Sequence, residues 1–214
     1  MTYPFPLSGL YAIVNVDEKT ADNIRLNVEE AIKGGARVIQ YRDKTGTPQP
    51  SLAQRLLNLC HAYNIPLIIN DDIDLASAIH ADGVHLGRRD QAIDEARQTL
   101  GGNAIIGVSC YDSLARAIDA QEKGATYVAF GRFFPSKSKP HATPVDKSIL
   151  HRAKTTMHIP LVAIGGITPQ NGTELLEAGA DLLAVIEGIF GAPAPRQAAN
   201  RYLALFRNTA NDAC

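Results

Sequence analysis

The chain has 214 residues, of which 45% are hydrophobic and 20% charged, and its formal net charge is −1. This composition can bury one sizeable core, and we expect a single domain over residues 1–214. The near-neutral charge argues against nucleic-acid binding, which normally requires a basic excess. The three cysteines, Cys60, Cys110 and Cys214, lack the spacing of a metal site, and their odd number fits reduced thiols in a cytosol.

The first ten residues and the length of the apolar runs indicate where in the cell the protein is expected. Residues 1–10 have no basic segment followed by a long apolar core, so no signal peptide is predicted. No run approaches the roughly 18 apolar residues of a transmembrane helix. We therefore expect a cytoplasmic protein that binds no membrane, and the sequence leaves open whether it forms a homo-oligomer.

Short apolar runs alternate with helical stretches along the chain. Strands are expected at residues 11–15, 38–42, 67–70, 83–87, 105–109, 127–131, 161–165 and 182–186. Helices are expected at about 24–32, 51–63, 73–80, 92–100, 113–123, 147–156 and 195–206, with Ser51 as an N-cap. Gly-Ala pairs at 35–36, 124–125 and 179–180 fit the end of a helix before a buried strand.

Eight strand–helix units are the number that closes a (β/α)8 TIM barrel, a fold of the α/β class. The nearly continuous apolar strands fit parallel strands that are covered on both faces. An open doubly wound sheet is the alternative, but no G-x-G-x-x-G follows the first strand. The sequence therefore predicts a single (β/α)8 barrel.

The segment Gln40-Tyr41-Arg42-Asp43-Lys44 ends the second predicted strand. Alternation along a strand places Gln40, Arg42 and Lys44 on one face, with Tyr41 and Asp43 on the other. One amide and two cations on one face fit an anion site, although an exposed edge with solvated charges is the alternative. In such barrels, chemistry takes place on the loops after the carboxyl ends of the strands.

Asp71 and Asp90 lie at the tips of the next two predicted strands. Two carboxylates there could hold Mg²⁺, which prefers oxygen ligands and shares them with substrate phosphates. Either aspartate could instead cap a helix, and Asp72 is interpreted as the cap of the helix that follows it. Cations expected at the same rim favour a Mg²⁺–diphosphate site. These cations are Arg42, Lys44 and Lys139.

Polar residues also follow the later predicted strands. Gly165-Gly166 fits a phosphate cradle, but a tight turn would need the same residues. The segment Ser136-Lys137-Ser138 could bind a second phosphate or form an ordinary loop. His85 lies inside a strand and is interpreted as a hydrogen-bonded core residue and not as a catalyst.

Six motifs, in this order, resemble the thiamine phosphate synthase family over about residues 10–190. They are Gln40-Tyr-Arg-Asp-Lys44, Asn70-Asp71-Asp72, Gly83-Val-His-Leu-Gly87 with Asp90, Gly107-Val-Ser109, Phe134-Pro-Ser-Lys-Ser-Lys139 and Ala163-Ile-Gly-Gly-Ile167. The resemblance implies a transferase of thiamine biosynthesis. It would join 4-amino-2-methyl-5-hydroxymethylpyrimidine diphosphate (the pyrimidine diphosphate) to 4-methyl-5-(2-hydroxyethyl)thiazole phosphate (the thiazole phosphate), and release diphosphate.

The resemblance also implies roles for individual residues. The pyrimidine diphosphate would be held by Gln40, Arg42, Lys44, Asn70, Ser109 and Lys139. Mg²⁺ would be bound by Asp71 and Asp90. The thiazole phosphate would be held by Ser136, Lys137, Ser138 and Gly166. We assign the whole segment Gln40–Lys44, with Tyr41 and Asp43, to substrate binding, and we expect the reaction to depend most on Arg42, Lys44, Ser109 and Lys139.

Three departures from the family pattern matter. Arg88-Arg89 stands before Asp90 where the family often has Gln-Glu, and two serines replace threonines in the thiazole loop. Glu187 stands where a serine is usual, and a carboxylate facing a phosphate would be repelled. The alternatives are a thiazole tautomerase with the same barrel and a non-catalytic phosphate-binding barrel. Neither needs a diphosphate metal site, so the acidic and basic strand ends favour the synthase.

Overall fold

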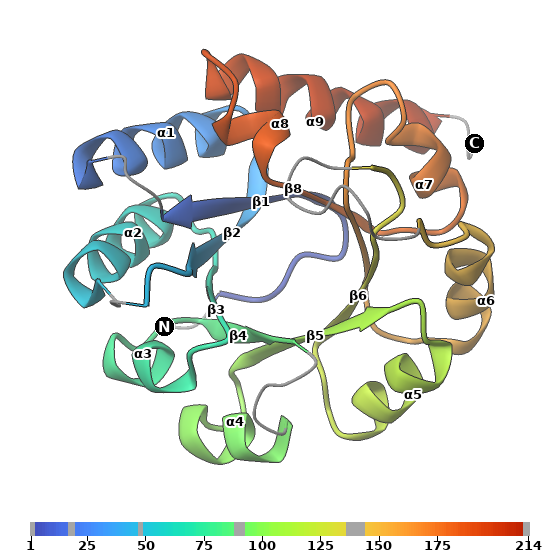
Figure 1. Ribbon diagram of the computed structural model, residues 1–214, viewed down its shortest axis with the longest axis horizontal. Helices are drawn as coiled ribbons and strands as arrows, with labels where there is room; N and C mark the ends of the chain where they lie inside the picture. Colours follow the sequence, from blue (N-terminus) through green and yellow to red (C-terminus); the bar gives the residue numbers. More distant parts are fainter. Residues whose placement is uncertain (1–2, 17–19, 47–48, 88–92, 136–143, 212–214) are drawn as a thin grey trace.

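The computed structural model describes residues 3–16, 20–46, 49–87, 93–135 and 144–211. Eight parallel strands close into a barrel in the order of the sequence, from β1 to β8, and β8 pairs with β1. Figure 1, a view along the barrel, shows the helices as an outer ring around these strands. The (β/α)8 prediction is confirmed, and the open sheet is excluded.

The strands are β1 (Gly9–Val16), β2 (Ala36–Asp43), β3 (Leu67–Asn70), β4 (Gly83–Leu86), β5 (Ile105–Tyr111), β6 (Tyr127–Gly131), β7 (Leu161–Ile164) and β8 (Leu182–Val185). The helices are α1 (Ala21–Lys33), α2 (Pro50–Ala62), α3 (Ile73–Ala78), α4 (Ile93–Leu100), α5 (Leu114–Glu122), α6 (Ser148–Thr156), α7 (Thr173–Glu177), α8 (Glu187–Phe190) and α9 (Pro195–Asn211). Every strand end lies within two residues of its predicted position. The short helices α7 and α8 were not predicted.

The starts of the helices test the predicted caps. The prediction of Ser51 as an N-cap is wrong: α2 begins at Pro50, and the N-cap Gln49 makes no side-chain capping bond. Proline suits the first helical position because it has no N–H group to satisfy and its φ is already helical. The prediction for Asp72 is confirmed, since its carboxylate accepts a hydrogen bond from the Leu75 N–H at 2.8 Å.

At the amino ends of the strands, side chains tie neighbouring strands together. A residue just before β4, β6 or β8 accepts a hydrogen bond from a backbone N–H near the start of the preceding strand. The pairs are Asp82 with Leu67 at 2.9 Å, Thr126 with Ile106 at 3.0 Å, and Asp181 with Leu161 at 2.9 Å. These bonds satisfy backbone donors that the ladder would leave unpaired, and they fix the end of the barrel opposite the predicted site.

The segment before β1 crosses the ring of strands, as the blue trace in Figure 1 shows. The Tyr3 N–H donates to the buried Asp82 at 3.2 Å, which places this segment at the amino end of the barrel. Phe5 enters the interior, where its ring stacks on Tyr127 with centroids 4.2 Å apart. Phe5 therefore packs beneath the interior residues that face the carboxyl end.

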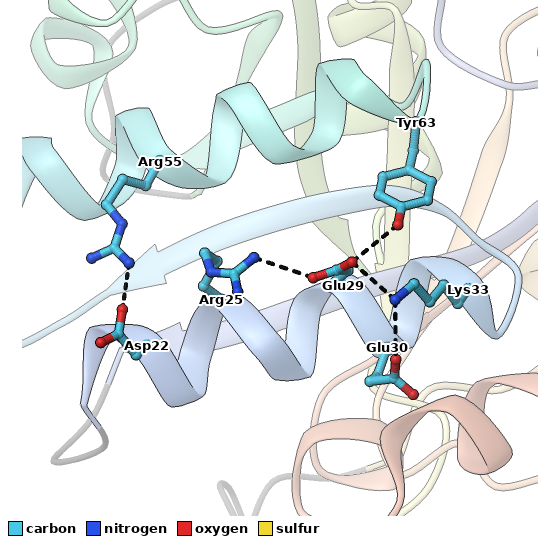
Figure 2. A network of polar contacts seen from close by, with 7 residues as sticks. All are labelled: Asp22, Arg25, Glu29, Glu30, Lys33, Arg55 and Tyr63. Carbon is cyan, nitrogen blue, oxygen red and sulfur yellow. Dashed lines mark hydrogen bonds and ion pairs between the residues drawn. The ribbon is translucent and has the colours of Figure 1, made fainter.

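Outside the barrel, polar contacts join α1 to α2 across their exposed faces (Figure 2). Arg55 of α2 pairs with Asp22 of α1, and the Tyr63 hydroxyl donates to Glu29 Oε1 at 3.1 Å. Glu29 is also bonded within α1, to Arg25 at 3.1 Å and Lys33 at 2.9 Å. Exposed pairs of this kind contribute little to stability, because solvent screens their charges. They support the helices that flank β2, whose carboxyl end carries the main candidate segment.

Candidate active site

The carboxyl end of β2 presents its side chains as the alternation predicted. Gln40 faces the barrel interior and is only 2% exposed. Arg42 is half-buried on the same face, and its Nη1 donates to Asn15 Oδ1 at 3.0 Å. Asn15 lies directly opposite Arg42 in the register of β1 and β2. The contact holds one arm of the guanidinium at the rim of the barrel.

The opposite face of β2 holds the loop that follows it. Tyr41 is buried among the surrounding helices, and its hydroxyl donates to Asp43 Oδ2 at 3.0 Å. Asp43 Oδ1 accepts from the backbone and the hydroxyl of Thr45 at 2.9 and 2.7 Å. Burial and the nearby Asp43 carboxylate raise the pKa of Tyr41 above its ordinary value. Tyr41 and Asp43 line a pocket of about 110 Å³ together with Gly46, Ile69, Asn70, Asp72 and Leu75.

Lys44 and Asp71 meet where β2 and β3 end. Asp71 has a left-handed backbone with φ 66°, which aspartate tolerates better than most residues, and its N–H donates to the His85 carbonyl at 2.9 Å. Its Oδ2 accepts from Asn70 Nδ2 at 2.7 Å and forms an ion pair with Lys44 Nζ. The fold thus brings together a cation, a carboxylate and an amide that the sequence predicted for one site.

Ser109 reaches the same end of the barrel from β5 and contacts His85 of β4. His85 Nε2 lies 2.9 Å from Ser109 Oγ, and His85 Nδ1 lies 3.0 Å from the Tyr127 hydroxyl. Burial lowers the pKa of His85 to about 4, although the nearby Asp71 opposes that shift. The interpretation of His85 as a hydrogen-bonded interior residue is confirmed.

Five of the predicted site residues lie outside the residues that the structure describes. They are Asp90, Ser136, Lys137, Ser138 and Lys139. Gly166, which is described, has φ 64°, and a Cβ there would lie 2.3 Å from the Pro135 carbonyl oxygen. The loop after β7 therefore packs on the residue that directly precedes the predicted serine segment, and glycine is required for that approach.

Glu187, the residue that departs from the family pattern, begins the short helix α8. Its side chain is exposed, and Oε2 lies 2.7 Å from the position that a Cβ on Gly191 would occupy. The carboxylate is therefore directed along α8 toward its last turn.

Three polar residues of the candidate site were not predicted from the sequence. Asn15 is the last residue of the first predicted strand and lies one residue before the end of β1, so its position at a strand end was a usable signal. Tyr11 and Tyr127 lie within apolar strands, and their hydroxyls are 2.7 Å apart across the barrel. No spacing in the sequence signals a contact between residues 116 positions apart.

The donor atoms can be compared with the needs of Mg²⁺. Within the described ranges, no three His, Cys, Asp or Glu side chains are grouped so that they could hold a metal. Mg²⁺ usually takes one or two carboxylates and completes its shell with water and substrate phosphates. The Asp71 carboxylate beside the Asn70 amide, at a rim with cations for phosphate, fits that kind of shared site.

Comparisons with known proteins identify the family. The family model described as thiamine monophosphate synthase matches residues 10–189. This chain belongs to the thiamine monophosphate synthase family. All six motifs that carried the resemblance lie within the matched residues, so membership of the thiamine monophosphate synthase family confirms that inference.

Relatives in the thiamine monophosphate synthase family match nearly the whole chain. The thiamine-phosphate synthase of Methylococcus capsulatus is 48% identical over 208 residues, which cover 96% of this chain and 92% of that protein. The thiamine-phosphate synthase of Nitrosococcus oceani is 48% identical over 198 residues, with coverage of 92% and 91%. The solved thiamine phosphate pyrophosphorylase from Pyrococcus furiosus superposes with a TM-score of 0.82 at 34% identity, covering 94% and 96% of the two chains.

Proposed function

We propose that this chain is a thiamine-phosphate synthase, a transferase that couples the pyrimidine diphosphate to the thiazole phosphate and releases diphosphate. Its family membership and its relatives of 48% identity, which carry that name, support the proposal. The structural observation that carries it is the meeting of Lys44 with Asp71 at the mouth that Arg42 also borders. The tautomerase and the non-catalytic barrel find no support among these relatives.

The basic residues would bind the leaving diphosphate. Lys44 is about half exposed, with a side-chain exposure of 52%, and can reach an anion at the mouth. Arg42 is held by Asn15, so less side-chain freedom is lost when its guanidinium binds phosphate oxygens. Charge-assisted bonds from both cations would stabilise the growing negative charge as the bond between carbon and diphosphate oxygen breaks.

The acidic residues would hold Mg²⁺. We assign this role to Asp71, whose side chain is 29% exposed at the mouth, and to Asp90, which lies outside the described residues. When bound, Mg²⁺ would supply charge neutralisation for the diphosphate. The thiazole nitrogen then forms its bond to the pyrimidine-methyl carbon, a step that needs no general base from the protein.

The thiazole phosphate would bind on the other side of the mouth, between the loops after β6 and β7. The close packing of Gly166 on Pro135 supports this assignment, since Pro135 directly precedes the serine segment in the sequence. We further propose a cytoplasmic location, in accord with the cysteine usage. No helix within the described part of the chain is long and apolar enough to span a membrane.

A coupling assay tests the proposal. The protein is incubated with both substrates, with Mg²⁺ or with a chelator, and thiamine phosphate and diphosphate are quantified. We expect equal amounts of both products with Mg²⁺ and neither with the chelator. Conversion of a thiazole without the pyrimidine would indicate the tautomerase, and binding of the thiazole phosphate without turnover would indicate the non-catalytic barrel.

A further inference from the structure

A chain of five polar side chains crosses the inside of the barrel beneath the mouth. In order of contact, they are Gln40 of β2, Tyr11 of β1, Tyr127 of β6, His85 of β4 and Ser109 of β5. The four successive contacts measure 2.8, 2.7, 3.0 and 2.9 Å. The first three side chains are buried, whereas the last two keep partial exposure. The chain of contacts therefore runs from the closed interior to the mouth.

The direction of these hydrogen bonds follows from the number of protons available. Gln40 Nε2 donates to the Tyr11 hydroxyl oxygen. Among the described residues, the other partner of the Tyr11 hydroxyl is Tyr127, so the Tyr11 proton goes there. A buried hydroxyl proton without an acceptor is unfavourable, so buried hydroxyls are nearly always paired. By the same reasoning, Tyr127 donates its own proton to Nδ1 of His85.

This order fixes the protonation of His85. Nδ1 accepts a proton from Tyr127, so it carries none of its own, and the neutral ring must carry its proton on Nε2. The Nε2–H group then donates to Ser109 Oγ. With its oxygen accepting from His85, Ser109 has its own proton available for a group at the mouth.

We propose that Tyr11, Tyr127 and His85 form a positioning relay that presents the Ser109 hydroxyl as a hydrogen-bond donor to an uncharged acceptor on the substrate. The inference rests on the proposed function, under which that acceptor is a ring nitrogen of the aminopyrimidine. The relay residues act through Ser109 and do not touch the substrate. If the Gln40 amide were turned over, every donor would reverse and Ser109 would become an acceptor.

The surroundings of Tyr127 hold the relay in place. A Cβ on Gly107 would lie 2.0 Å from Tyr127 Cζ and 2.3 Å from its hydroxyl oxygen, so glycine leaves room for the end of the ring. Phe5 stacks on the same ring, with the two ring centroids 4.2 Å apart. Buried hydroxyls cost free energy unless they are paired, and phenylalanine would fill the same space without that cost. The paired hydroxyls therefore support a role beyond packing.

The tautomer of His85 tests the proposal without any need for turnover. Long-range ¹H–¹⁵N spectra of the labelled, full-length protein distinguish the two neutral tautomers from the imidazolium, and loss of the signals in His85→Gln assigns them. We expect the Nε2–H tautomer at neutral pH. An Nδ1–H tautomer, a mixture of tautomers or an imidazolium would overturn the relay. This result is independent of whether the protein couples the two substrates.

Kinetics provide a second test in the active enzyme. We expect Tyr127→Phe to raise the KM for the pyrimidine diphosphate about fivefold, the effect of one neutral hydrogen bond, and to leave the KM for the thiazole phosphate unchanged. Tyr3→Phe, which loses a hydroxyl bond to the His61 carbonyl at the amino end, is the matched control and should change neither. Equal KM values in the two variants would contradict the relay.

Replacement of His85 separates donation from packing. His85→Gln keeps an amide N–H that can donate to Ser109, whereas His85→Leu cannot donate. We expect the glutamine variant to bind the pyrimidine diphosphate several-fold more tightly than the leucine variant, as one hydrogen bond would account for. Equal binding by the two variants would show that the ring only fills space.

Discussion

Lys44 and Asp71 form an ion pair across the tips of β2 and β3. The two residues are 27 positions apart in the sequence, and each follows directly after its strand. The pair places a cation that we propose for phosphate binding beside a carboxylate that we propose for Mg²⁺ binding, and a shared metal–diphosphate site needs both kinds of group. Substitutions at each partner should therefore have different effects.

Lys44→Met removes the ammonium charge and keeps most of the apolar stem. We expect the KM for the pyrimidine diphosphate to rise about tenfold or more, because a hydrogen bond to a charged group contributes about 1.5–3 kcal/mol. Steady-state kinetics with each substrate varied in turn measure the effect. Lys33→Met, on the exposed face of α1, is the control and should behave as wild type. A similar rise for the thiazole phosphate would contradict the assignment.

Substitution of Asp71 should reduce activity, whereas substitution of its neighbour Asp72 should reduce stability. Asp71→Asn keeps a residue that tolerates the left-handed backbone, so folding should be unaffected, while Mg²⁺-dependent kcat/KM should fall roughly 100-fold. Asp72→Ala removes the cap of α3 and should lower the free energy of unfolding by about 1 kcal/mol, with coupling nearly intact. Denaturant unfolding and the coupling assay measure the two effects. The metal assignment fails if Asp71→Asn remains fully active.

Substitution of Arg42 should weaken substrate binding more than substitution of Asn15, which only positions the Arg42 guanidinium. Arg42→Ala is expected to weaken binding of the pyrimidine diphosphate about tenfold or more, through loss of charge-assisted bonds. Asn15→Ala leaves the cation in place but frees its guanidinium, so the loss should be a few-fold at most. Calorimetric titration with each substrate measures both losses. Equal weakening of the thiazole phosphate would place Arg42 elsewhere in the mechanism.

The buried thiols should be unreactive over the usual working range of pH. Burial raises the pKa of Cys110 to about 12, and burial also raises the pKa of Cys60. The thiolate is the reactive form, so raising the pH from 7 to 9 should produce almost none of it at either position in the folded protein. Alkylation followed by peptide mass spectrometry should label both cysteines only in denaturant. Labelling of folded Cys110 that increases with pH would contradict the packing around it.

The fold was largely predictable because each βα unit carries local signals. Buried parallel strands appear in the sequence as apolar runs. Gly35, which separates α1 from β2, has φ 104°, a value that few other residues adopt easily. The helices α7 and α8 have five and four residues, too few for a helical period to show. The start of α2 was misplaced by one residue because Ser51 was expected to be the cap, whereas Pro50 already occupies the first helical position.

The site was predictable where strand ends determine it and unpredictable inside the barrel. Arg42 and Lys44 follow from the end of β2, because parallel strands direct their carboxyl ends to one rim. Tyr11 and Tyr127 come into contact because their side chains lie at the same level inside the barrel. The way in which the strands close the barrel determines which side chains share a level. Local sequence patterns do not show how the barrel closes, so the contacts of the relay could be found only from the structure.

In the proposed reaction, Lys44, Arg42 and Asp71 together hold one metal-bound diphosphate at the mouth of the barrel. A crystal structure of the protein with diphosphate and Mn²⁺ in place of Mg²⁺ tests it most directly, because anomalous scattering locates the metal. We predict a metal peak within coordination distance of Asp71, with diphosphate oxygens bonded to Lys44 and Arg42. A metal and diphosphate bound at the amino end of the barrel, or away from Asp71, would contradict the proposed site.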